Sequence, residues 1–190
     1  IANPVTQIAD LQSIGDLCAE QNLVYVVDNT MTPSYLFKAK GVGASLITTS
    51  LTKYVGGHGT VTAGAVIDTG LYDWSRYDNI LEGFRKLDPS AQALTQIKKK
   101  GLRDLGACLS SDSAQMIALG AETMALRMDR SCSTALALAE YLEQHPKIAK
   151  VYYPGLENHP QHGRAKQWFK HFGAIISFDP VETIDPCRKV

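Results

Sequence analysis

The stretch Ser50-Leu-Thr-Lys53-Tyr-Val-Gly-Gly-His58 decides how the rest of the chain is interpreted. The β-branched and aliphatic run Ser45-Leu-Ile-Thr-Thr49 leads into it, and two glycines close it. This pattern predicts that Lys53 lies where a buried strand ends and a tight loop begins. Burying a lysine is costly because its ammonium group must lose its water. A desolvated lysine amine can bond covalently to a carbonyl group, whereas a lysine just past a strand end can also be an ordinary surface residue.

The composition is that of an ordinary globular protein and argues against two classes of partner. The 190 residues are 45% hydrophobic and 20% charged, and Lys+Arg and Asp+Glu are both 19. A formal charge of zero disfavours nucleic acid or an acidic membrane as the main partner. No apolar run approaches the ~20 residues that span a bilayer, and the opening Ile1-Ala-Asn-Pro4 does not resemble a signal peptide. We therefore expect a cytoplasmic protein.

The cysteines, histidines and chain ends lead to three further expectations. The four cysteines have no paired spacing and are interpreted as reduced thiols: Cys18, Cys108, Cys132 and Cys187. The five histidines show no metal-binding spacing, so no metal site is expected, and His58 is interpreted as shaping its loop. Because both ends stop outside regular elements, we expect an internal piece of a longer polypeptide.

Short apolar runs alternate with amphipathic stretches, which predicts an α/β fold. Strands are expected at residues 23–27, 45–49, 62–68, 149–153 and 174–178. Helices are expected at residues 10–22, 33–40, 92–100, 112–120, 131–144 and 159–172, and Asp88-Pro-Ser90 is expected to be the start of the third. Asp28 and Lys53 follow consecutive strands joined by a crossover, so they should lie at the same edge of one sheet. In the second half of the chain helices and strands alternate on a smaller scale. This predicts one domain at residues 1–124 and the beginning of a smaller one at residues 125–190.

Five polar residues near these predicted strand ends have the chemistry needed to hold pyridoxal phosphate. The Lys53 amine can bond to the aldehyde, and an Asp28 carboxylate can keep the ring nitrogen protonated, which makes the ring an electron sink. The Ser50 and Thr52 hydroxyls can hold a phosphate, and Asn3 can hydrogen-bond the ring hydroxyl. Taken singly, Asp28 could be a turn-former and the hydroxyls ordinary strand residues. Their combination at strand ends is what predicts a cofactor site.

Motifs along essentially the whole chain occur in the order of one enzyme family: Asn3-Pro4, Val26-Val-Asp-Asn-Thr30, Ser50-Leu-Thr-Lys-Tyr54, Gly56-Gly-His58, Ala125-Leu-Arg-Met-Asp-Arg130, Tyr153-Pro-Gly-Leu156, His159-Pro160 and Ile176-Ser-Phe178. The chain resembles the trans-sulfuration family, the pyridoxal-phosphate enzymes of cysteine and methionine metabolism. The resemblance implies the PLP-dependent transferase fold type I, which is aspartate-aminotransferase-like, with a mainly parallel sheet and a smaller C-terminal α/β domain.

The resemblance also implies a role for each candidate residue. Lys53 would form the Schiff base and later move protons, and Asp28 would pair with the pyridine nitrogen. Ser50 and Thr52 would bind the phosphate, and Asn3 would contact the ring hydroxyl or the substrate side of the cofactor. The family's other site residues, among them a ring-stacking tyrosine and a carboxylate-binding arginine, are expected outside residues 1–190. Because the family shares its sites between subunits, a homo-oligomer is implied, usually a dimer of dimers.

Several segments between Ile67 and Ser110 resemble the O-acetylhomoserine sulfhydrylases. That resemblance implies γ-replacement on O-acetylhomoserine with sulfide or a sulfur carrier, giving homocysteine and acetate in methionine biosynthesis. Thr62-Ala-Gly64 also looks like methionine γ-lyase, so that activity and cystathionine γ-lyase or γ-synthase stay open. Ser111 and Ser131 depart from the proline and histidine that the family usually has there. A non-catalytic structural or binding remnant is the alternative of another class.

Overall fold

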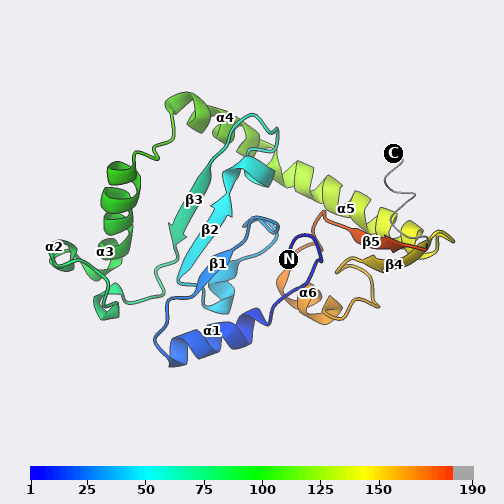
Figure 1. The fold of residues 1–190 in the computed structure, drawn as a ribbon, viewed down its shortest axis with the longest axis horizontal. Coiled ribbons are helices and arrows are strands. Elements are labelled where there is room, and N and C mark those ends of the chain that lie inside the picture. Colours follow the sequence, from blue (N-terminus) through cyan, green and yellow to red (C-terminus); the bar gives the residue numbers. More distant parts are fainter. Residues whose placement is uncertain (182–190) are drawn as a thin grey trace. The chain divides into compact units, whose positions relative to one another are not determined.

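The strand that leads to Lys53 forms and lies at the centre of a three-stranded sheet in the computed structural model, which describes residues 1–181 (Figure 1). Its order is β1 (Val26–Asp28), β2 (Leu46–Ser50) and β3 (Gly64–Asp68). β1 pairs parallel to β2, with Asp28 opposite Thr48, and β3 pairs antiparallel to β2, with Ser50 opposite Gly64. The carboxyl ends of β1 and β2 therefore meet at one edge, as predicted.

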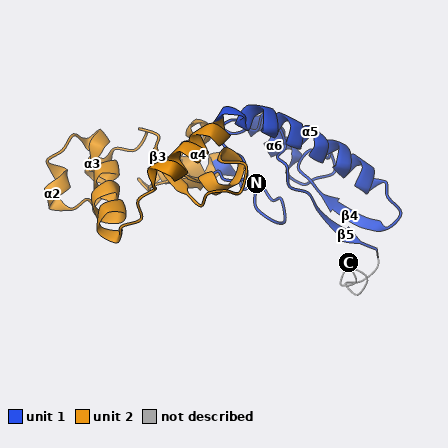
Figure 2. Cartoon of the chain, turned by 90° about the horizontal axis from the view of Figure 1, so that it is seen from above, with its two compact units in different colours: residues 1–11, 29–38, 122–190 blue, residues 12–28, 39–121 orange. Residues whose placement is uncertain are grey.

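The chain divides into two units, shown in orange and blue in Figure 2. The Lys53 unit consists of Gln12–Asp28 and Ala39–Ala121, and the α5 unit of Ile1–Leu11, Asn29–Lys38 and Glu122–Val190. Each unit combines segments that are far apart in the sequence. The predicted domains, at residues 1–124 and 125–190, are each one continuous stretch. Those domain boundaries stay a prediction.

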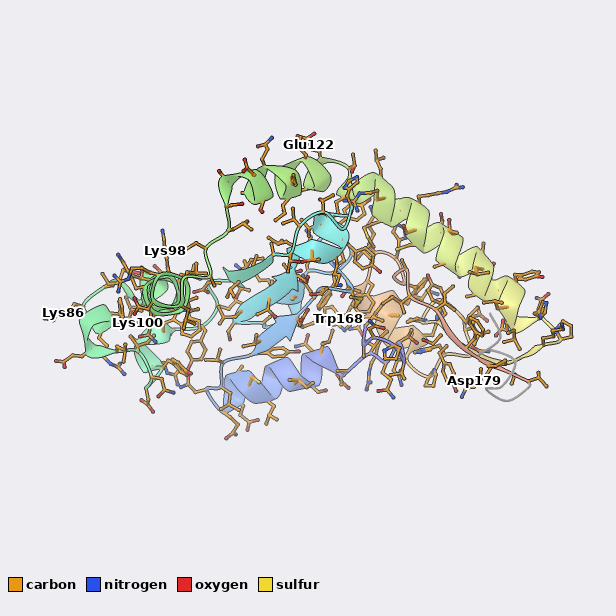
Figure 3. The ribbon with its side chains drawn as sticks, turned by 45° about the horizontal axis from the view of Figure 1, so that its top comes forward. Lys86, Lys98, Lys100, Glu122, Trp168 and Asp179 are labelled. Carbon is orange, nitrogen blue, oxygen red and sulfur yellow. The ribbon has the colours of Figure 1, made fainter. Side chains whose placement is uncertain are left out.

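Helices and turns complete the Lys53 unit around its sheet: α1 (Leu11–Glu20), η1 (Ala39–Val42), η2 (Leu51–Val55), η3 (Trp74–Arg76), α2 (Glu82–Arg85), α3 (Pro89–Gln96), η4 (Ile97–Arg103) and α4 (Ser111–Glu122). α3 begins as the sequence predicts, because the Asp88 carboxylate accepts a hydrogen bond from the Ser90 amide at 2.9 Å. The lysine run at residues 98–100 lies exposed on η4, where Figure 3 labels Lys98 and Lys100.

The core of the Lys53 unit lies where α1 meets η1 and the strands. Val42 is fully buried, and Val27 and Ile47 are each 7% exposed. Gly15 of α1 is buried against the Val42 carbonyl so closely that an added Cβ would lie 2.0 Å from that oxygen. A glycine is therefore required for this helix to approach η1.

The α5 unit contains a long helix packed on a two-stranded sheet. Its elements are α5 (Met124–Glu143), β4 (Ile148–Tyr152), α6 (His162–Trp168) and β5 (Ser177–Pro180), and β4 and β5 pair antiparallel. One buried cluster joins α5 to β4 and to the segment that follows it: Ala135, Ala139, Val151, Tyr153 and Leu156. The Tyr153 hydroxyl donates to the Gly173 carbonyl at 2.9 Å, and burial raises the pKa of this phenol.

Two predicted helices differ from the structure for tertiary reasons. Residues 33–38 are not helical, and only the 3-10 turn η1 follows them, because the Phe37 backbone forms a bridge with Phe169 and both side chains are buried. Within the predicted helix at residues 159–172 only α6 is helical. Phe169, the residue directly after α6, forms that same bridge with Phe37. By contrast, α5 begins seven residues earlier than predicted, at Met124.

Three further features concern the described residues 1–181: the cysteines, metal-binding groups and long apolar helices. Cys18, Cys108 and Cys132 are free thiols there, whereas Cys187 lies outside the described residues. No group of three or more His, Cys, Asp or Glu side chains in this part of the chain is arranged to hold a metal ion. Likewise, none of the helices described is both long enough and apolar enough to cross a membrane.

We predict that Gly15→Ala destabilises the full-length protein by about 1–3 kcal/mol, because the added methyl group overpacks against backbone that cannot rotate away. The measurement is urea denaturation. Gly83→Ala is the matched control, since nothing lies within 4 Å of a Cβ added there. It should be neutral or slightly stabilising. Equal effects of the two substitutions would contradict the proposed close contact.

Candidate functional site

Four of the predicted site residues are brought to one edge of the sheet by the pairing of β1 with β2. Asp28 is the last residue of β1, and Ser50 is the last residue of β2. Thr52 and Lys53 follow directly in η2. The parallel register, with Asp28 opposite Thr48, places the Asp28 carboxylate at the edge where β2 runs into the lysine segment. The order of residues along the chain and the register together build this cluster.

The segment that carries Lys53 is a short π-helical stretch with a kink at Lys53, where the sequence predicted a loop. The Gly56 amide donates to the Leu51 carbonyl at 2.8 Å, and the Gly57 amide donates to the Lys53 carbonyl at 2.7 Å. Lys53 itself has φ −85° and ψ −116°, outside the helical range, so it interrupts the turn. Short π-helical pieces are frequent at functional sites. The turn presents the Lys53 side chain directly after the strand end.

A hydroxyl–backbone pair holds this turn against the start of β3. Thr52 Oγ1 accepts from the Ala63 amide at 2.8 Å and donates to the Ala63 carbonyl at 3.2 Å. The Leu51 amide also donates to the Ala63 carbonyl, at 2.9 Å. Because a hydroxyl has one proton, Thr52 must turn that proton away from Ala63 before it can donate to a phosphate, while its oxygen can still accept from the amide.

Close backbone packing supports the end of the turn. A Cβ added at Gly120 of α4 would lie 2.0 Å from the Gly56 carbonyl oxygen, so α4 rests directly on this backbone. Nδ1 of His58 lies 2.7 Å from the same carbonyl, which agrees with the loop-shaping role expected for this histidine. Gly57 adopts φ 73° and Gly59 φ 67°, conformations that residues with side chains rarely adopt. The loop after Lys53 is thus shaped by glycines.

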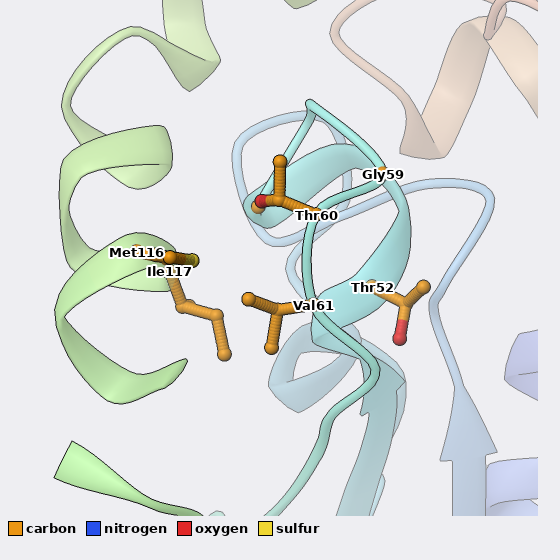
Figure 4. A pocket seen from close by; sticks show the side chains of 7 residues that line it. Thr52, Gly59, Thr60, Val61, Met116 and Ile117 are labelled. Carbon is orange, nitrogen blue, oxygen red and sulfur yellow. The ribbon is translucent and has the colours of Figure 1, made fainter. Parts of the chain in front are cut away.

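A small depression beside the turn is a packing contact, not a cofactor cavity. Seven residues of η2, the following loop and α4 line it, and Figure 4 shows their side chains: Thr52, Gly56, Gly59, Thr60, Val61, Met116 and Ile117. It has no room for a water molecule. Its lining is mostly apolar or glycine, and Lys53 is not part of it.

The structure differs from the sequence expectations on burial. Lys53 was expected to be desolvated, but it is exposed, as is Asp28, and Ser50 and Thr52 are half-buried. A long side chain at the end of a strand lies in solvent unless another segment covers it. The described part of the Lys53 unit does not cover Lys53. Asn3 is exposed and belongs to the α5 unit, so its placement in the site stays a prediction.

The chemistry of this donor set fits pyridoxal phosphate. One edge of one sheet carries an amine for an aldehyde, a carboxylate for a ring nitrogen, and hydroxyls for a phosphate. Sequence reasoning missed contacts that shape the site without taking part in its chemistry. The chief ones are those of Ala63 with Thr52 and of Gly120 with Gly56. Neither shows a local signal, because each acts through its backbone on a residue distant in sequence.

The chain is similar to known proteins over nearly its whole length. A sequence model of the family described as "Cys/Met metabolism PLP-dependent enzyme" matches residues 1–189. The chain is 39% identical over 190 residues to "O-acetyl-L-homoserine sulfhydrylase 1" of Thermus thermophilus, an alignment covering 94% of this chain and 45% of that protein. It is also 39% identical over 180 residues to an "L-methionine gamma-lyase" of Fusobacterium nucleatum subsp. polymorphum, covering 94% of this chain and 40% of that protein.

A solved structure shows the same similarity in three dimensions. The O-acetylhomoserine sulfhydrylase of Wolinella succinogenes superposes with a TM-score of 0.87 at 37% identity, over 96% of this chain and 51% of that chain. This likeness confirms the predicted fold class, as part of a fold type I enzyme. The chain spans about half the length of the curated relatives it matches.

We predict that Thr52→Val lowers the stability of the full-length protein by about 1 kcal/mol, because the Ala63 amide loses its acceptor. It should also weaken the affinity for pyridoxal phosphate. Thr52→Ser keeps the hydroxyl and should retain both properties. Urea denaturation of the apoprotein and cofactor titration measure the two effects. If Thr52→Ser were as unstable as Thr52→Val, the hydroxyl–backbone pair would not hold the turn.

Proposed function

This chain belongs to the Cys/Met metabolism PLP-dependent enzyme family, and we propose that it is part of an O-acetylhomoserine sulfhydrylase. The proposed reaction joins sulfide, or sulfur from a carrier, to O-acetylhomoserine and yields homocysteine and acetate. The observation that carries the proposal is the shared edge of β1 and β2, where Asp28 and Lys53 lie. The similarity to O-acetylhomoserine sulfhydrylases of Thermus thermophilus and Wolinella succinogenes supports the choice of reaction.

The residues at the sheet edge divide the work of holding the cofactor. Lys53 Nζ would bond to its aldehyde carbon, Asp28 would hydrogen-bond its ring nitrogen, and Ser50 and Thr52 would hold its phosphate. When bound, the cofactor supplies an electron sink for charge that develops on the substrate's α carbon. Asn3 is proposed to contact the ring hydroxyl or the substrate side.

Lys53 has a second proposed role in moving protons. When it is not bonded to the cofactor, the Lys53 Nζ amine would accept the proton that leaves the substrate's α carbon. Lys53 is exposed, so packing within the described residues of its unit does not hold its long side chain, and its own backbone conformation is non-helical. A proton would then also leave the β carbon, and the bond between the γ carbon and the acetate oxygen would break. Sulfur would bond to the γ carbon afterwards, and protons would return to the α and β carbons, which gives homocysteine and acetate.

Methionine γ-lyase is the second candidate, because a relative with that name is as similar to this chain as the sulfhydrylase of Thermus thermophilus, at 39% identity. The same residues would serve both reactions, since both require removal of the α proton and loss of a group from the γ carbon. Cystathionine γ-lyase or γ-synthase activity follows the same logic. A non-catalytic remnant would lack the covalent bond to Lys53.

The setting of the enzyme is also proposed. Family members act on amino acids together with sulfur donors, and we propose that this protein does so as a cytoplasmic homo-oligomer, a dimer of dimers. The family resemblance supports this arrangement. Sedimentation of the full-length protein would measure the oligomeric state directly.

We predict that Lys53→Ala abolishes turnover while leaving the protein folded. The loss should be about 1,000-fold or more, because both the covalent bond and the proton acceptor disappear. The absorbance at about 420 nm that is typical of a lysine-bound cofactor should also vanish. Lys99→Ala, which removes an exposed lysine of η4, is the control and should remain active and yellow. Activity of Lys53→Ala within tenfold of the wild type would refute the assignment.

Assays of the full-length wild-type protein decide between the candidate reactions. The wild-type protein is given O-acetylhomoserine and sulfide, and homocysteine is measured. It is then given methionine alone, and 2-oxobutyrate is measured. Homocysteine formation supports the sulfhydrylase, whereas 2-oxobutyrate from methionine without homocysteine synthesis identifies a γ-lyase. A colourless protein that forms neither product would support the remnant.

We predict that Asp28→Asn still binds the cofactor but turns over more slowly, by on the order of 100-fold, because an amide cannot hold a proton on the ring nitrogen as a carboxylate does. Steady-state kinetics and a cofactor titration separate the two properties. Asp78→Asn changes an exposed aspartate elsewhere in the Lys53 unit and should leave both unchanged. Undiminished turnover of Asp28→Asn would exclude the ring-nitrogen role.

A further inference from the structure

The peptide group between Gly56 and Gly57 connects two hydrogen bonds just after Lys53. Its amide, on Gly57, donates to the Lys53 carbonyl at 2.7 Å. Its carbonyl, on Gly56, lies 2.7 Å from Nδ1 of His58. Because a peptide group is planar, the directions of its carbonyl and its amide are coupled. A contact that fixes the Gly56 carbonyl therefore also fixes the donor to Lys53, and all four residues belong to the Lys53 unit.

The hydrogen bond between His58 and Gly56 has a definite direction. A carbonyl oxygen has no proton to give, so Nδ1 of His58 carries the proton and donates it. The His58 side chain is exposed, and burial does not hold its ring. What His58 contributes to the loop is therefore a donor atom at the Nδ1 position.

This peptide group needs a partner because it lies between two glycines. Glycine adopts a wider range of φ and ψ than other residues, so a peptide group between two glycines rotates more easily than most. Gly120 of α4 packs closely on the Gly56 carbonyl, since a Cβ added at Gly120 would lie 2.0 Å from that oxygen. The packing limits where the carbonyl can lie, and the bond from His58 selects its direction.

The Lys53 carbonyl is the group that the glycine pair holds. Lys53 has φ −85° and ψ −116°, outside the helical range, so a regular helical pattern does not fix its carbonyl. That carbonyl accepts from the Gly57 amide and also from the Gly56 amide, which Leu51 shares. Rotation of the peptide group between the glycines would remove the Gly57 donor. The ψ angle of Lys53, and with it the direction of its side chain relative to the turn, would then be free to change.

We infer that His58 is a positioning residue that holds Lys53 in the backbone conformation from which its amine bonds to the cofactor aldehyde. This inference rests on the proposed function, since it acts through the covalent role given to Lys53. The effect passes through one peptide group, from the Gly56 carbonyl to the Gly57 amide. His58 has no contact with the cofactor in this proposal and is not a catalytic residue.

The experiment compares two probes on the full-length apoprotein: pyridoxal phosphate, and an analogue with a methyl group in place of the aldehyde. Only the first can bond covalently to Lys53, so the ratio of the two dissociation constants reports that bond. For the wild type we expect the ratio to favour pyridoxal phosphate by roughly tenfold or more. His58→Leu has no donor, and we expect its ratio to fall roughly 2- to 10-fold, the value of about one hydrogen bond, with the analogue's affinity unchanged.

His58→Asn is the rescue variant. Asparagine has the branched shape of leucine, but its Nδ2 is a donor at the same distance along the side chain as histidine Nδ1. Its ratio should stay near that of the wild type. If His58→Leu does not fold, His58→Ala takes its place, since it also removes the donor.

The matched control is His145→Leu. His145 is also an exposed histidine whose Nδ1 is bonded to the backbone two residues away, where it accepts from the Lys147 amide at 3.2 Å. It belongs to the α5 unit and has no part in the proposed role. Its ratio should equal that of the wild type.

Each outcome has one meaning. A fall in the ratio for His58→Leu, but not for His58→Asn or His145→Leu, supports the inference. If His58→Leu weakens binding of both probes equally or changes neither, or if either of the other variants falls as far, the positioning role is overturned. The role of Lys53 then stands as long as the wild type discriminates between the probes. If the wild type itself does not discriminate, the covalent role of Lys53 fails and this inference fails with it.

Discussion

The parallel pairing of β1 with β2 is the constraint on which the rest of the candidate site depends. It sets Asp28 opposite Thr48 and so brings two strand ends to the same edge. A shift of one residue in this register would turn the Asp28 side chain to the other face of the sheet. Before the first residues of the two strands the pairing becomes irregular. There the Tyr25 amide donates a hydrogen bond to the Ser45 hydroxyl at 3.1 Å, and both residues are buried. Because these residues are buried, they fix the register of the two strands, including the exposed end where Asp28 lies.

At the exposed end, backbone contacts shape the turn that carries Lys53. Thr52 ties it to Ala63 by a pair of hydrogen bonds, worth about 1 kcal/mol each at a half-buried position. The contact of Gly120 with Gly56 is steric and stricter, because a Cβ 2.0 Å from a carbonyl oxygen must displace backbone. The steric condition therefore outweighs the hydrogen bonds in deciding which sequences can form this turn. Both act next to the lysine without touching its amine.

The two strands that end at the site are anchored in different ways. β2 is held on both sides by neighbouring strands, whereas β1 has β2 on one side and continues directly into residues 29–38, which belong to the α5 unit. The ion pairs around Asp129 are 40–48% exposed at their side chains and contribute little stability singly. Asp129 also accepts a hydrogen bond from the Tyr35 hydroxyl, next to Leu36 and Phe37, whose side chains are buried.

The sequence by itself determined the family, the fold class, the cofactor and the order of the strands that carry Asp28 and Lys53, because these depend on local patterns and on motifs readable residue by residue. It also located the start of α3, since capping by Asp88 is a local interaction. Only the tertiary structure decided that Lys53 lies in a kinked π-helical stretch, that Thr52 is hydrogen-bonded to Ala63, and that residues 33–38 do not form a helix. Those outcomes come from contacts between residues distant in sequence, such as Gly56 with Gly120 and Phe37 with Phe169. Local propensity carries no record of such partners, which become neighbours only when the chain packs.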